Sequence, residues 1–224
     1  MLHLPYTAMV LGFVVVGAVA SPKLSWTILS ASLVAYLLAL GIGAHFLDQI
    51  PGMGTRYVKH WPAWSLAAVG LLGVGLGIVI GILGAVLVLG PGFLFLVAVQ
   101  ALGALGYPLA PLFRGLLHRD SVFALTWGSL PFLTSYYAQS GQVISYISIP
   151  LVILFAGIAL VEIRVSRTSR ELRKQAREAS VARSPGSAFA APPYRRADRF
   201  LQGLSISTVL AALVLLTLRT WMGG

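Results

Sequence analysis

Long apolar stretches, separated by short polar ones, follow one another along almost the whole chain. Many are close to the ~20 residues that an α-helix needs to cross a bilayer. Because hydrocarbon offers no hydrogen-bond partners, such stretches must bond their own backbone, which predicts helices. No alternating ten-residue pattern indicates a barrel. We therefore predict an all-α, polytopic bundle of about seven transmembrane helices, over residues 5–20, 27–47, a pair within 63–106 divided at Gly90-Pro91-Gly92, 121–138, 143–162 and 200–221.

Composition supports a membrane protein. Only 10% of the residues are charged and 58% are hydrophobic, with a mean hydropathy of +0.87. A soluble domain carries about 25% charged residues, so that class is excluded. The absence of cysteine excludes disulfides, thiolate metal sites and a cysteine nucleophile. The N-terminus lacks a basic region, so Ala18-Val19-Ala20 is interpreted as the end of a first helix rather than a signal cleavage site.

The basic residues predict the orientation. Apart from Lys23 after the first predicted helix and Arg219 in the last, they follow the second, fourth and sixth predicted helices. That places them on one side of the membrane, and basic loops are cytoplasmic in most membrane proteins. We therefore expect an integral protein of the cell (inner) membrane with its N-terminus inside. The predicted parts are a six-helix bundle (1–162), a basic cytoplasmic segment and linker (163–199) and a seventh transmembrane helix (200–224). Ten of the 16 Lys and Arg lie in the middle part: Arg164, Arg167, Arg170, Arg173, Lys174, Arg177, Arg183, Arg195, Arg196 and Arg199.

Two features of this pattern have a structural and a functional interpretation. The arginines from Arg164 to Arg177 recur every three or four residues, along one side of a helix. That side could lie against anionic headgroups, or it could be a solvated face that only anchors the topology. Glycines recur at the same spacing from Gly70 to Gly84, which permits close helix contact and indicates packing rather than chemistry. Residues 184–187 and 190–193 are typical of a flexible linker.

The first candidate for chemistry is the pair His45 and Asp48, at the predicted cytoplasmic end of the second helix. Residues three apart share a helix face. A histidine and a carboxylate on one face could bind a divalent metal, position a pyrophosphate through that metal or form a proton-transfer pair. Alternatively, both side chains simply lie at headgroup level.

A second cluster is expected on the same side of the membrane: Arg114, His118, Arg119 and Asp120. Asp120 could cap the helix that follows, and the two arginines could be ordinary residues of a cytoplasmic loop. Together with His45 and Asp48, however, this face carries more ionisable groups than anchoring requires. Ionisable groups near membrane depth are costly, which makes them candidate functional residues.

The order of segments resembles the UbiA superfamily of intramembrane prenyltransferases. The stretch from Gly41 to Gly54 is similar to the superfamily's first aspartate-rich region, typically N-D-x-x-D-x-x-x-D, at the end of the second helix. The stretch from Trp127 to Gly141 looks like the fifth helix, with a Gly-x-x-Pro core and a closing glycine. Tyr107 before a basic loop is similar to the tyrosine and Lys/Arg segment ahead of that helix. The resemblance covers about residues 5 to 165.

The resemblance implies a prenyl pyrophosphate substrate and catalysis that depends on Mg²⁺. It assigns the catalytic and metal-binding roles to Asp48 and His45, with Asp120 as a further metal ligand. The substrate-binding residues would be Tyr107, Arg114, His118 and Arg119.

The sequence also departs from the family pattern. On the first motif, Ala44 replaces the asparagine, His45 the first aspartate and Gly52 the last, whereas Asp48 is retained. The second acidic motif, expected after helix six, falls on residues 162–167, which contain no paired aspartates. In the family, these carboxylates hold the two Mg²⁺ ions that neutralise the leaving group. The family usually has nine helices.

Two functions therefore remain open. The first is a divergent prenyltransferase that acts on an isoprenoid pyrophosphate, with catalysis uncertain. The second is a non-catalytic lipid- or quinone-binding accessory subunit of a membrane complex. Transport has weaker support. The expected partners are membrane lipids, an isoprenoid or quinone ligand and, for the second function, other subunits. No nucleic-acid partner is expected.

Overall fold

The computed structural model describes residues 4–52, 60–113, 117, 119–142, 145–182 and 194–223. Throughout these residues the regular structure is helical, without strands, so the all-α prediction is confirmed. The helical elements, in chain order, are α1 (Leu4–Ala20), α2 (Trp26–Tyr36), η1 (Leu37–Ala44), α3 (His45–Asp48), α4 (Ala63–Gly84), η2 (Ala85–Leu89), α5 (Gly92–Gly106), η3 (Ala110–Phe113), α6 (Asp120–Phe123), η4 (Ala124–Ser129), α7 (Leu130–Ser140), α8 (Ser148–Ala182) and α9 (Tyr194–Gly223).

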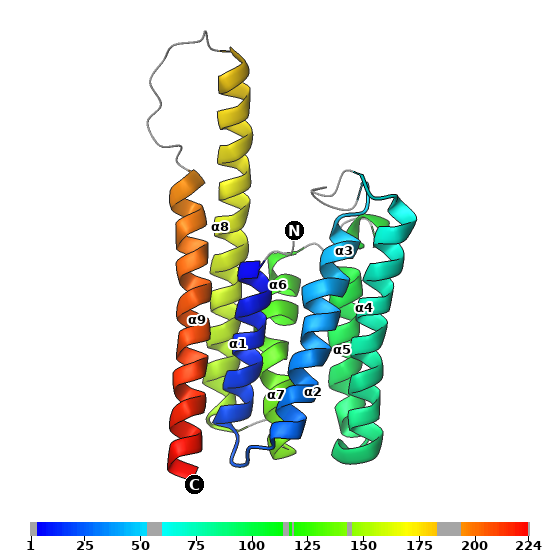
Figure 1. Ribbon diagram of the computed structural model, residues 1–224, viewed down its shortest axis with the longest axis vertical. Coiled ribbons are helices and arrows are strands. Elements are labelled where there is room, and N and C mark those ends of the chain that lie inside the picture. The colour runs from blue at the N-terminus through cyan, green and yellow to red at the C-terminus, as the bar shows by residue number, and fades with distance from the viewer. Residues whose placement is uncertain are drawn as a thin grey trace.

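The helices stand side by side in one bundle (Figure 1). Helix α1 packs against α9 and α7, α8 against η4 and α9, and α4 against η1. The C-terminal end of α9 lies at the opposite end of the bundle from the projecting part of α8. The positions of these helices agree with the predicted apolar ranges, and Gly90, at φ 84°, forms the predicted break. Only glycine adopts such a φ readily.

Four helical segments are long and apolar enough to cross a membrane: Trp26–Asp48, Ala63–Leu89, Ser148–Ala176 and Tyr194–Met222. Pro5–Ala20 and Gly92–Gly106 are shorter apolar helices. The outer faces of the bundle carry many exposed large apolar side chains, such as Leu72, Leu87 and Phe95. Together these features indicate an integral membrane protein. The count of about seven spanning helices and the cytoplasmic orientation remain predictions.

The sixth helix continues past the end of its predicted apolar range, as the helical spacing of the arginines from Arg164 to Arg177 indicates. Instead of ending at Glu162, α8 continues to Ala182 and projects beyond the rest of the bundle (Figure 1). The prediction followed hydrophobicity, which falls after Ile163, but Arg, Lys, Glu, Gln and Ala are all good helix formers. The arginines therefore follow the axis of α8 outward rather than folding back along the bundle end. The expected linker residues 184–187 and 190–193 lie outside the described residues.

Glycines allow the closest helix contacts. A Cβ added at Gly73 would lie 2.7 Å from the Leu38 carbonyl oxygen, and one at Gly77 would lie 2.8 Å from that of Ala35. The predicted packing role of the glycine stripe on α4 is thus confirmed at these positions. At Gly128 of η4, a Cβ would lie 2.5 Å from the Phe155 carbonyl oxygen. This contact holds α8 tightly against η4, next to the site described below.

Candidate functional site

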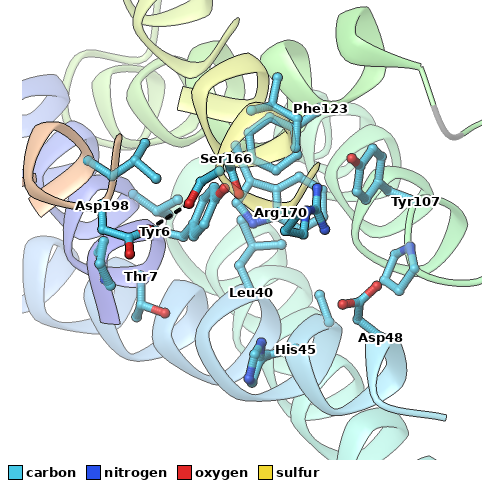
Figure 2. A pocket seen from close by; sticks show the side chains of 18 of the residues that line it. Tyr6, Thr7, Leu40, His45, Asp48, Tyr107, Phe123, Ser166, Arg170 and Asp198 are labelled. Carbon is cyan, nitrogen blue, oxygen red and sulfur yellow. Dashed lines mark hydrogen bonds between the residues drawn. The ribbon is translucent and has the colours of Figure 1, made fainter. Parts of the chain in front are cut away.

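A cavity of about 280 Å³ opens at the end of the bundle from which α8 projects (Figure 2). We call it the basic-end pocket. It lies where the first turn of α1, the end of α3, the end of α5, the α6–η4 segment, the middle of α8 and the start of α9 meet. Its lining residues are Pro5, Tyr6, Thr7, Val10, Leu40, Ala44, His45, Asp48, Tyr107, Pro108, Phe123, Trp127, Ile163, Ser166, Ser169, Arg170, Arg173, Asp198, Leu201 and Gln202.

An aromatic cluster forms one wall of this pocket. Phe123 and Trp127 are four residues apart and stack with ring centroids 5.0 Å apart at an interplanar angle of 3°. The Tyr107 ring lies 5.3 Å from Phe123 and 5.2 Å from Trp127. Leu40 and Val10 add aliphatic surface. Such a wall suits an apolar, unsaturated chain better than a polar ligand.

Two arginines of α8 line the pocket, in different states. The Arg173 guanidinium forms an ion pair with Asp198 on α9, at 2.5 Å. The Ser169 hydroxyl donates a hydrogen bond of 2.7 Å to the same carboxylate. Within the described part of the chain, Arg170 has no ion pair or hydrogen bond, and its side chain is exposed. Its positive charge is therefore available to a ligand.

His45 and Asp48 both line the pocket, as their spacing on one helix face predicts. They lie on α3, which continues the α2–η1 helix, and Figure 2 shows them below Tyr107. Both make further interactions within the protein. Their roles as metal ligands and catalytic residues remain predictions.

Tyr107 also lines the pocket, just beyond the end of α5. Burial raises the pKa of its phenol, whereas the hydrogen bond and the positive charge of Arg167 act in the opposite direction. Tyr107 therefore remains a neutral hydroxyl at physiological pH, with its ring against the aromatic wall. This geometry is compatible with the predicted substrate-binding role, which remains untested.

Asp120 lies elsewhere. It is the first residue of α6 and forms ion pairs with Arg167 at 2.5 Å and with Arg164 at 3.8 Å. It is not part of the pocket lining, so the structure does not bring it together with His45 and Asp48 there. The N-cap residue of α6 is Arg119 rather than Asp120, and Arg119 also lies outside the lining. Asp120 thus anchors α6 to α8, because its carboxylate faces two arginines across the helix contact.

The other two predicted residues, Arg114 and His118, fall outside the described residues. In the part of the chain that is described, no group of three or more His, Asp and Glu side chains could hold a metal ion. A Mg²⁺ site made entirely of these side chains is therefore not seen, and the Mg²⁺ prediction stays a prediction.

Sequence reasoning missed three residues of α8 that lie on one line: Glu162, Ser166 and Arg170. Ser166 and Arg170 line the pocket. Glu162 is only 1% exposed, and neither of its carboxylate oxygens has a hydrogen-bond partner. Their spacing of four residues was readable in the sequence. It escaped notice because Glu162 stands where the apolar stretch ends, where a carboxyl is normally expected to reach water.

A second cavity of about 180 Å³ lies among α2, α4, α5 and α7, towards the opposite end of the bundle. We call it the apolar crevice. Three of its polar side chains, Tyr36, Gln100 and Thr134, bond to the protein. The Tyr36 and Thr134 hydroxyls lie 2.5 Å apart, Tyr36 donates to the Leu130 carbonyl at 3.2 Å, and the Gln100 amide donates to the Thr126 carbonyl at 3.2 Å.

Comparison with known proteins adds no relative to this picture. No family model, curated protein or solved structure matches the chain.

Proposed function

We propose that this chain is a UbiA-like integral membrane protein that binds an isoprenoid pyrophosphate in the basic-end pocket and acts as a divergent prenyltransferase. In this proposal the basic end of the bundle faces the cytoplasm of the cell (inner) membrane. The observation that carries it is the pairing of an unpartnered guanidinium, Arg170, with a wall of aromatic and aliphatic side chains in one cavity.

The two parts of the pocket match the two parts of such a ligand. A guanidinium presents several donors in a planar fork, which suits phosphate oxygens. The faces of Tyr107, Phe123 and Trp127 suit an unsaturated chain, and they also attract positive charge. That attraction would favour an allylic carbon that gains positive charge as its bond to the pyrophosphate oxygen breaks. The bonding electrons leave with the pyrophosphate, and the carbon then bonds to an electron pair of an acceptor, which releases a proton to the solvent.

A metal ion would fit this site only with help from the ligand. Mg²⁺ prefers oxygen ligands and is commonly held by one or two carboxylates together with substrate phosphates. Asp48 supplies one carboxylate at the pocket, and His45 supplies a nitrogen ligand that suits Mg²⁺ less well. When bound, the ion would neutralise charge that develops on the leaving pyrophosphate. Asp48 is the residue that would hold it.

The alternative is a non-catalytic lipid- or quinone-binding accessory subunit. The scarcity of metal ligands among the described residues favours it, because the first Asp-rich motif keeps a single aspartate. Both functions use the same pocket, so they differ in turnover rather than in binding.

The test measures binding of labelled geranylgeranyl pyrophosphate to the purified protein in detergent, with and without Mg²⁺, together with pyrophosphate release. Removing one charged hydrogen-bonding group weakens binding by about tenfold or more, so Arg170→Gln should lower the affinity by this factor. Arg196→Gln is the matched control, because Arg196 is an exposed arginine on the first turn of α9 outside the pocket lining. Asp48→Ala should remove the dependence on Mg²⁺.

Binding that Arg170→Gln weakens, with release of pyrophosphate, supports the prenyltransferase. The same binding without release supports the accessory subunit. Absence of binding, or equal affinities for the Arg170→Gln and Arg196→Gln variants, would overturn both.

A further inference from the structure

Glu162 is a carboxyl group buried inside a helix that is long and apolar enough to cross a membrane. Neither carboxylate oxygen has a hydrogen-bond partner, and the carboxyl has no ion pair within the described residues. The same structure pairs other acidic groups of this region, since Asp120 contacts two arginines and Asp198 contacts Arg173. Glu162 therefore differs from Asp120 and Asp198, whose carboxylates are paired with arginines.

Burial without a partner decides the chemical form of this group. An ionised carboxylate in apolar surroundings is so unfavourable that the group takes up a proton instead. Glu162 lies one helical turn beyond a close contact of α8 with η4, where a Cβ at Gly128 would lie 2.9 Å from Ala159. An ionisable residue within a membrane-spanning helix is a candidate functional residue, because its burial there is costly. From its burial and missing partners, we therefore expect Glu162 to be a neutral acid that holds a proton.

Two hydroxyl groups near this acid form a candidate polar route to the basic-end pocket, although neither is hydrogen-bonded to the Glu162 carboxyl. Ser166 lies one helical turn from Glu162 and lines the pocket, and Tyr6 lies across from it on α1. The Tyr6 and Ser166 hydroxyls share a hydrogen bond, and Tyr6 lies within electrostatic range of Glu162. Figure 2 shows Tyr6 and Ser166 next to each other at the edge of the pocket. Hydroxyl groups can both donate and accept, as a proton relay requires.

The charged groups around the route leave Glu162 without a counterion. Arg170 is eight residues from Glu162 on the same helix, about 12 Å at 1.5 Å per residue, which is too far for a direct pair. Other ionisable side chains on the packed elements include Tyr6 on α1, Tyr107 after α5, Asp120 on α6, Arg164, Arg167 and Arg173 on α8, and Asp198 on α9.

We propose that Glu162 is a proton-exchange site of the basic-end pocket, which holds a proton inside the bundle and exchanges it with the pocket through the hydroxyls of Tyr6 and Ser166. The group supplies the chemistry of a buried general acid to whatever occupies the pocket. This inference does not rest on the proposed function, because proton exchange takes place in the ligand-free protein.

Infrared spectroscopy of the purified, ligand-free protein tests the proposal. A neutral carboxyl without hydrogen bonds gives a carbonyl band at the high-frequency end of the carboxylic acid range, and the band shifts when its proton exchanges for deuterium. We expect this band in the wild type and its loss in Glu162→Gln. Glu171→Gln is the matched control, because Glu171 is an exposed carboxyl of the same helix. It should leave the band in place.

The relay is tested by the rate at which the band shifts after transfer to D₂O. Tyr6→Phe and Ser166→Ala should each slow the shift several-fold, while Glu162 itself is retained. These two variants keep the proposal testable if Glu162→Gln fails to fold. A band that survives in Glu162→Gln, that is absent from the wild type, or that exchanges equally fast in all variants would overturn the proposal.

Discussion

The polar groups at the two cavities of this bundle differ in whether they have hydrogen-bond partners within the protein. In the apolar crevice, Tyr36, Gln100 and Thr134 come from three different helices and bond to one another or to backbone carbonyls. At the basic end, Arg170 lines the pocket and Glu162 is buried two helical turns away on the same helix, and neither has such a partner among the described residues. The first arrangement specifies how the helices pack, whereas the second leaves a carboxyl and a guanidinium without a partner in the protein.

The difference follows from where each group lies. Polar side chains on facing helices hydrogen-bond across the contact because hydrocarbon offers no alternative partner. Glu162 and Arg170 are two turns apart on the same face of α8, so they cannot reach each other. A molecule that fills the pocket could lie alongside this stretch. A buried carboxyl without a partner, such as Glu162, lowers stability, which is a common feature of functional sites.

The largest expected effect comes from removing the unpaired acid. Glu162→Met replaces it with an apolar side chain of similar length, and the unsatisfied group costs about 1–3 kcal/mol. We therefore expect the free energy of unfolding in detergent to rise by about that amount, seen as a higher Tm. Glu171→Met, at an exposed position of α8, should change it by less than about 0.5 kcal/mol. A lower Tm for Glu162→Met would mean that Glu162 has a stabilising partner.

An intermediate effect is expected from Tyr107 at alkaline pH. Its pKa is raised in the folded protein, so the unfolded chain releases this proton at lower pH than the folded one. The contribution is fully present below the unfolded pKa of about 10 and is lost as pH rises towards the folded pKa, by about 1.4 kcal/mol per pH unit. The Tm of the wild type should therefore fall more steeply above pH 10 than that of Tyr107→Phe. Parallel Tm curves would show that Tyr107 does not contribute.

The smallest effect is expected in the apolar crevice. Tyr36→Phe removes a hydroxyl that bonds to Thr134 and Leu130, and a typical hydrogen bond contributes about 0.5–1.5 kcal/mol. We expect unfolding in detergent to become easier by that amount, the opposite sign to Glu162→Met. Tyr146→Phe, at an 88% exposed position, is the control and should have no effect. Equal stability of wild type and Tyr36→Phe would remove the contrast between the two cavities.

Part of the candidate site could be predicted from local patterns. The spacing of His45 and Asp48 placed them on one helix face, and both line the pocket. Tyr107 was chosen by resemblance and also lies there. Asp120 was grouped with them because it was expected on the same side of the membrane, but its carboxylate faces Arg164 and Arg167 instead. Two residues on the same side of the membrane can still lie on helix faces that do not contact each other.

The sequence by itself determined the membrane class, the positions of the apolar helices and the turn at Gly90. These properties depend on hydrophobicity and backbone preference, which act locally along the chain. Only the tertiary structure decided that Asp120 is paired and that Glu162 and Arg170 are not. Pairing depends on which faces of distant helices come into contact, and no local pattern in one sequence carries that information.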